Sequence, residues 1–177
     1  MANNIEQYGI VFKGLKTGVH HFNFILDNRF FGHFGNPELR GGDMEINVEL
    51  DKKDQFLSLD FTFSGSVRVI CDRCLEEFDA PLTFRSSLVI KFVQEERENE
   101  ADVIYLERHE KNINLADYFI ESMCLNLPIK RVHEKNDIGV DMCDKDMIDK
   151  LEEHRTRRTE GETDPRWESL KNINKKN

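Results

Sequence analysis

Residues 57–69 read L-S-L-D-F-T-F-S-G-S-V-R-V, and apolar and polar side chains alternate along most of this stretch. The same alternation occurs at residues 44–50, M-E-I-N-V-E-L, and over residues 82–92. Alternation places one face of a strand against a core and the other in water, as in antiparallel sheets. The three stretches therefore predict neighbouring strands, with a hairpin turn at Asp51–Asp54 between residues 44–50 and residues 57–69.

The chain before residue 44 also predicts strands. His20–Leu26 alternates in the same way, and Arg29–Phe34 is expected to form a partner strand beyond Asp27-Asn28. Adjacent residues of a strand point to opposite faces of the sheet. Phe30 and Phe31 cannot both face the core in such a strand, so one ring is expected to be exposed or covered by another segment.

The period of the pattern changes near residue 114. Asn114 is a suitable helix cap, with Asp117 three residues later in a capping-box arrangement. Apolar residues then recur at helical spacing until Pro128 ends the segment. A second, shorter helix is predicted at Lys145–His154. The fold class is therefore α+β: an antiparallel, meander-like sheet in the N-terminal ~105 residues, then one main helix, a shorter helix and a C-terminal tail.

Charge and length limit the function classes. The 177 residues include 25 Lys and Arg against 34 Asp and Glu, a formal net charge of −9. Non-specific nucleic-acid binding depends on basic side chains that neutralise phosphates, so this balance argues against it. No apolar run approaches the roughly 18 residues that a membrane span needs. We expect a cytoplasmic protein without a membrane partner.

A change in composition divides the chain near its end. The run H-R-T-R-R-T-E-G-E-T at residues 154–163 contains no apolar side chain and is typical of a solvated linker. Asp164-Pro165 then favours a helix start, with Trp167 and Leu170 on one face. We predict one α+β domain over residues 1–154, and a polar linker with a short tail helix over residues 155–177.

The four cysteines suggest a metal site. Cys71-Asp72-Arg73-Cys74 follows a predicted strand, and two thiolates at this spacing can clamp one tetrahedral Zn²⁺. His133 and Cys143 are the candidates for the remaining ligands, in the pattern C-x2-C-x58-H-x9-C. Cys124 is less suitable because it lies within the predicted main helix, where a small core residue is expected.

Two other interpretations of the cysteine pair stay open. A redox pair would need a low thiol pKa, and the acidic residues Glu76, Glu77 and Asp79 are expected to raise that pKa instead. The thiols could also bind nothing. No nucleophile elbow, phosphate-binding loop or zinc-protease motif occurs, so neither an enzymatic activity nor a small-molecule substrate is predicted.

Two short segments are candidate partner contacts. Lys130 and Arg131 follow the main helix and can contact phosphate at a few points. In the tail, Arg166, Trp167 and Leu170 form an anchor that needs a groove, either on this chain or on a partner.

The order of these motifs resembles a known family. V-R-V-I-C-D-R-C-L-E at Val67–Glu76 precedes a helix that ends in L-P-I-K at Leu127–Lys130, followed by a His, a Cys and D-P-R-W-E-x-L at Asp164–Leu170. This combination resembles the YceD family of large ribosomal RNA subunit accumulation proteins. The terminal motif is similar to that of Bacteroidetes-type members.

The resemblance implies a bacterial, non-enzymatic factor for ribosome biogenesis, needed for accumulation of 23S rRNA. It implies a metal, with zinc as the candidate cofactor, held in part by Cys71 and Cys74. The implied partner is a precursor of the large ribosomal subunit, contacted through a ribosomal protein, through rRNA or through both. The alternative is an acidic scaffold or adaptor protein unrelated to RNA, with a tail anchored by Trp167.

Overall fold

The computed structural model describes residues 5–94, 97–100, 102–134 and 142–155. The chain divides into two compact units, Met1–Cys143 and Asp144–Asn177. The predicted domain of residues 1–154 stays a prediction. No helix in the described ranges is long and apolar enough to cross a membrane.

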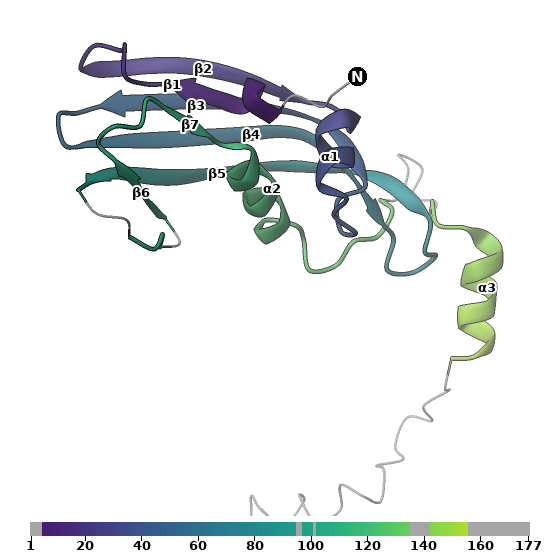
Figure 1. Cartoon of the computed structure of the whole chain (residues 1–177). Helices are drawn as coiled ribbons and strands as arrows, with labels where there is room; N and C mark the ends of the chain where they lie inside the picture. The colour runs from purple at the N-terminus through teal and green to yellow at the C-terminus, as the bar shows by residue number, and fades with distance from the viewer. Residues whose placement is uncertain (1–4, 95–96, 101, 135–141, 156–177) are drawn as a thin grey trace, which may run out of the picture. The chain divides into compact units, whose positions relative to one another are not determined.

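The first unit is built on a five-stranded sheet (Figure 1). Four of its strands follow one another as an antiparallel meander, which confirms the predicted sheet. The fifth strand pairs parallel to its neighbour, a direction that alternation cannot reveal because it reports only which face is buried. In order across the sheet, the strands are β2 (Gly18–Leu26), β3 (Gly41–Lys52), β4 (Phe56–Ile70), β5 (Glu77–Val93) and β6 (Val103–Glu107).

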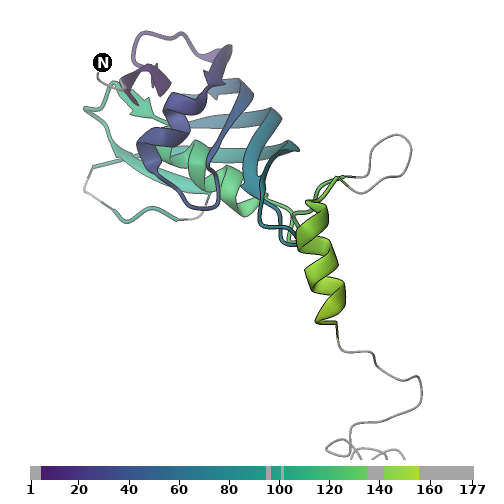
Figure 2. The same cartoon turned by 90° about the vertical axis from the view of Figure 1, so that its right-hand side faces the viewer.

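One face of the sheet carries the core. The alternating apolar side chains of β4 are almost completely buried, whereas its polar residues lie on the other face. Three further elements cover the apolar face in both views: the helices α1 (Asn28–Phe34) and α2 (Ala116–Leu125), and a small sheet in which β1 (Gly9–Val11) pairs with β7 (Asn112–Asn114) (Figures 1 and 2). The 3₁₀ helix η1 (Ile5–Tyr8) leads into β1.

Helix α2 is the predicted main helix. It begins two residues after Asn114, whose side chain accepts a hydrogen bond from the Ala116 backbone N–H at 2.9 Å. Phe119 is fully buried, and its ring packs against Phe24, Phe61 and Phe63 at centroid distances of 5.4 to 6.0 Å. Aromatic packing between α2 and the two strands β2 and β4 therefore fixes the helix on the sheet.

The strand predicted at Arg29–Phe34 is wrong, because the segment is helix α1. The Asp27 carboxylate accepts hydrogen bonds from the backbone N–H groups of Arg29 and Phe30, which caps the helix at its start. Helical geometry also removes the difficulty of the adjacent rings. Phe30 and Phe31 are only 3% and 1% exposed, since successive residues of a helix are separated by about 100° rather than by a full reversal.

The second unit contains α3 (Lys145–Glu153), which confirms the shorter predicted helix. Asp144 precedes it and accepts a hydrogen bond from the Met147 backbone N–H at 2.8 Å. The candidate tail residues Arg166, Trp167 and Leu170 lie outside the described residues.

Alanine substitutions at two glycines should have opposite effects on stability. Gly65 has φ +150°, and a Cβ there would clash with the carbonyl oxygen of Asp43 on β3. We expect Gly65→Ala to lower the free energy of unfolding by about 2 kcal/mol or more. Gly32 lies exposed in α1 with open space around it, so Gly32→Ala should raise the free energy by about 0.5–1 kcal/mol. Urea unfolding, followed by circular dichroism, measures the free energy of unfolding of both variants. Equal effects of the two substitutions would contradict the crowded position of Gly65 and the open position of Gly32.

Candidate metal centre

The turn between β4 and β5 positions the first two thiols. The Cys71 backbone N–H donates to the Glu76 carbonyl at 2.8 Å, and the Leu75 N–H donates to the Cys71 carbonyl at 3.0 Å. Leu75 adopts φ +64°, a left-handed conformation that is unusual for a leucine. These bonds close a tight turn with the side chains of Cys71 and Cys74 buried within the first unit.

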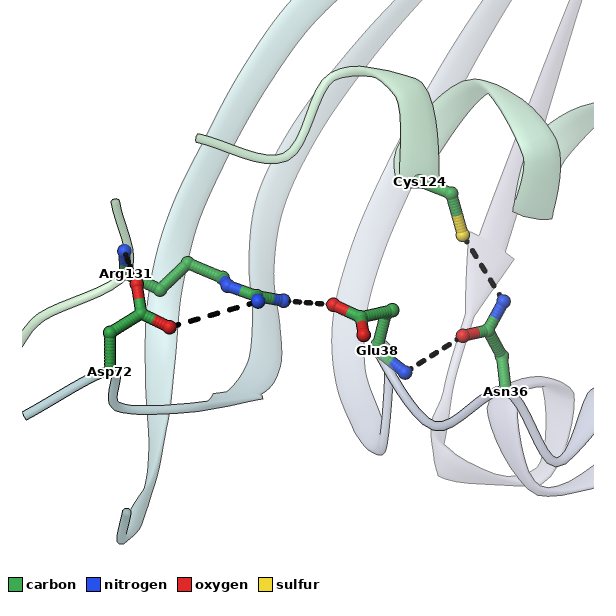
Figure 3. A network of polar contacts seen from close by, with 5 residues as sticks. All are labelled: Asn36, Glu38, Asp72, Cys124 and Arg131. Carbon is green, nitrogen blue, oxygen red and sulfur yellow. Dashed lines mark hydrogen bonds and ion pairs between the residues drawn. The ribbon is translucent and has the colours of Figure 1, made fainter. Parts of the chain in front are cut away.

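A second segment, which follows α2, is held against this turn by Arg131. The Asp72 backbone N–H donates to the Arg131 carbonyl at 2.7 Å. The Arg131 backbone N–H donates to the Asp72 carboxylate at 2.6 Å (Figure 3). The Arg131 guanidinium also pairs with Asp72 at 3.7 Å and with Glu38 from the loop before β3. This attachment fixes the backbone two residues before His133.

The four residues predicted as ligands come together in this place. One ligand atom from each of Cys71, Cys74, His133 and Cys143 lies within 4.8 Å of the others. The Sγ atoms of Cys71 and Cys143 are 3.8 Å apart, and Cys74 Sγ is 3.4 Å from His133 Nδ1. The three thiols are buried, and His133 is half-buried with its ring 4.6 Å from that of Phe78.

Electrostatics at the turn favour a thiolate on Cys71. Burial raises the pKa of this thiol, but backbone N–H groups of Cys74, Arg73 and His133 and the Cys74 side chain together bring its pKa down to about 6. The expectation of a raised pKa is therefore wrong, because hydrogen bonds to the sulfur outweigh the effect of burial. A thiolate is the form that binds a metal ion.

Cys124 lies apart from the cluster, on α2. Its Sγ accepts a hydrogen bond from the Asn36 side chain at 3.2 Å, and Asn36 in turn accepts one from the Glu38 backbone N–H at 2.8 Å (Figure 3). Burial raises the pKa of the Cys124 thiol. This cysteine therefore lacks the neighbours of the clustered cysteines and the lowered pKa of Cys71.

Sequence reasoning missed the residues that support the cluster. Asp72 lies between the two cysteines, and its partner Arg131 is 59 positions away, so no local pattern links them. Arg131 was predicted as a partner contact, and its guanidinium is engaged within the chain by Glu38 and Asp72. Lys130 is exposed. Partner binding by Arg131 and Lys130 stays a prediction.

The donor set fits a structural metal ion. Three thiols and one imidazole are a known tetrahedral ligand set, and four protein ligands leave no open position for a reacting water or substrate. Such an ion would join three parts of the chain: the β4–β5 turn, the segment after α2, and the residues around Cys143. Its binding free energy would then contribute to folding.

Replacing a clustered cysteine should remove the metal, whereas replacing Cys124 should not. Protein purified without chelator is expected to carry about one divalent metal ion per chain by mass spectrometry, and Cys71→Ser less than about 0.2. The melting temperature of Cys71→Ser should fall by about 5 °C or more. Cys124→Ser is the matched control and should keep its metal. If the wild-type chain carried no metal and Cys71→Ser melted at the wild-type temperature, the metal site would be contradicted, and Cys71 and Cys74 would be thiols that bind nothing.

Comparison with known proteins places this cluster within a family. The family model described as large ribosomal RNA subunit accumulation protein YceD matches residues 59–174, more than half of the chain. The matched part begins in β4 and includes all four clustered residues and the segment Asp164–Leu170. Neither the curated proteins nor the solved structures contain a match. The match does not test the similarity to Bacteroidetes-type members. The chain belongs to the YceD family of large ribosomal RNA subunit accumulation proteins.

Proposed function

We propose that this protein is a non-enzymatic, cytoplasmic factor that supports accumulation of large-subunit ribosomal RNA by binding a precursor particle or one of its proteins. The match to the YceD family carries the proposal, since the family name gives a role in large ribosomal RNA subunit accumulation. The family match includes the Cys/His cluster, whose four ligands leave no open coordination position. A structural metal and a binding role agree with this arrangement.

Zinc is the metal that suits these ligands best. Soft thiolates select zinc, copper(I) or iron–sulfur clusters, and a mixed set of three sulfurs and one imidazole nitrogen is typical of structural zinc sites. The lowered pKa of Cys71, about 6, supports a thiolate at neutral pH. In this proposal zinc stabilises the fold and takes no part in a reaction.

Charge on the exposed sheet face supports a protein partner. Glu45 and Glu49 on β3 are exposed there, and Glu49 lies directly opposite Asp60 of β4 in the strand register. Like charges at opposite positions destabilise a sheet, so added cations are favourable there. Within the chain, the His21 ring already lies 3.9 Å from the Glu49 carboxylate. A basic ribosomal protein supplies such cations, and the net charge of −9 fits a mainly protein–protein contact.

A thiol oxidoreductase is the second candidate, and the lowered pKa of Cys71 favours it. Burial argues against it. Cys71 and Cys74 are 0% and 3% exposed, so a substrate disulfide would have no access to either sulfur. Reduction of an insulin disulfide by the purified protein would support this candidate over the assembly factor.

Sedimentation of a tagged chain through a sucrose gradient tests the assembly role. We expect the protein to migrate with large-subunit precursors, and Trp167→Ala to move it to the top of the gradient because the tail anchor is lost. Leu151→Ala, which removes another apolar side chain, is the control and should leave migration unchanged.

Two results would contradict the assembly role together. The wild-type chain would stay at the top of the gradient, and cells without it would keep normal 23S rRNA levels. That outcome would favour the acidic scaffold unrelated to RNA. A Trp167→Ala chain that still migrates with precursors, but melts at a lower temperature, would show instead that the tail docks on its own body.

A further inference from the structure

A hollow with a basic lining lies at one end of the central sheet. Its volume is about 580 Å³, within the usual range of ligand sites. Four separate segments form it: the turn after β1, the β3–β4 hairpin turn, the end of β5 and the turn after β6. Because none of these segments contributes more than two basic side chains, the sequence gives no sign of this site.

The lining is positive on an acidic protein. Five basic side chains against two acidic ones give the lining a net charge of +3, whereas the whole chain has −9. The basic side chains are Lys13, Lys16, Lys52, Lys53 and Arg108, and the acidic ones are Asp54 and Glu110.

Little of this positive charge is neutralised by neighbouring carboxylates. Lys53 pairs with Asp51 at 3.3 Å. Within the described ranges of the chain, the other four basic side chains make no ion pair, and Lys13, Lys16 and Arg108 are exposed. An anion that enters the hollow could therefore bind these basic side chains without breaking an existing ion pair.

Hydrogen bonds hold the walls of the hollow in place. The Lys52 ammonium donates to the carbonyl oxygens of Phe12 and Leu15 at 2.8 and 2.9 Å, which joins the β3–β4 hairpin to the turn after β1. The backbone N–H groups of Phe12 and Lys13 both donate to the Lys111 carbonyl. The site is thus formed in advance, which lowers the cost of ordering it on binding.

Aromatic rings add a second feature to the lining. Phe92 at the end of β5 is half-buried, and its ring lies 5.5 Å from that of the buried Phe12. Basic side chains around a partly exposed ring are the combination that holds single-stranded nucleic acid, where phosphates meet cations and a base stacks on the ring.

We propose that this hollow binds the phosphodiester backbone of a single-stranded segment of RNA, with Lys13, Lys16 and Arg108 at the phosphates and Phe92 available for stacking. The inference rests on the proposed role in large-subunit RNA accumulation, which names RNA as the polyanion. It limits RNA contact to one small surface, in agreement with the acidic balance of the rest of the chain.

The hollow and the Cys/His cluster lie at opposite ends of the sheet. The hollow includes the turn that precedes β4, whereas Cys71 follows the last residue of β4. The 15 residues of β4 span about 45 Å at roughly 3.3 Å per residue. RNA binding at the hollow should therefore not depend on metal at the other end.

Fluorescence anisotropy with a labelled single-stranded RNA of about 12 nucleotides tests the proposal on the full-length protein. At about 50 mM salt we expect binding that Lys13→Glu/Lys16→Glu weakens by about tenfold or more, because two phosphate contacts become repulsive. Lys145→Glu/Lys150→Glu in α3 makes the same change of charge elsewhere and should alter the affinity by less than about twofold. With three to four contacts, the slope of log affinity against log salt should be about −2 to −3.

Three outcomes would overturn the proposal: no binding at about 50 mM salt, equal losses in the two double variants, or equally tight binding of inorganic triphosphate, which would indicate a small-anion site. Arg108→Glu is the substitute if the Lys13/Lys16 variant melts early, and it should weaken binding in the same way. The gradient reports separately on the assembly role. A chain that migrates with precursors but does not bind the oligonucleotide would contradict this inference alone.

Discussion

Two hydrogen bonds between Asp72 and Arg131 place the segment after α2 against the β4–β5 turn, and the cluster of three thiols and one imidazole depends on them. One joins backbone groups, and the other runs from the Arg131 backbone N–H to the Asp72 carboxylate. They join parts of the chain 59 residues apart, and they fix the position of His133 beside Cys74. The Arg131 guanidinium extends the same link to Glu38, in the loop before β3. A metal ion at the cluster would strengthen a contact that the polypeptide already makes.

The sheet gives this contact a rigid base and separates two sites of different chemistry. Its long central strands end at the sulfur-rich cluster on one side and at the basic hollow on the other. Between them, the exposed face is acidic, with Glu49 opposite Asp60. An acidic protein arranged in this way can bind a basic protein over a broad surface while it meets RNA at one place.

The sequence allowed prediction of the elements whose pattern is local. Alternation gave the four antiparallel strands, and the spacing of cysteines and histidine gave the cluster, since both depend on residue type at fixed separations. Helix α1 was missed because Asp27 is suited equally to a turn and to a helix cap, and the prediction placed Asp27-Asn28 between two strands. The parallel direction of β6, the Asp72–Arg131 link and the basic hollow arise from tertiary contacts between distant segments, which no periodicity records.

X-ray absorption spectroscopy at the zinc edge, on full-length protein purified without chelator, tests the central claim most directly. A metal held by Cys71, Cys74, Cys143 and His133 predicts a first shell of three sulfurs at about 2.3 Å and one nitrogen at about 2.0 Å. The absence of zinc, or a shell of oxygen and nitrogen alone, would contradict a structural site at the end of the β4–β5 hairpin.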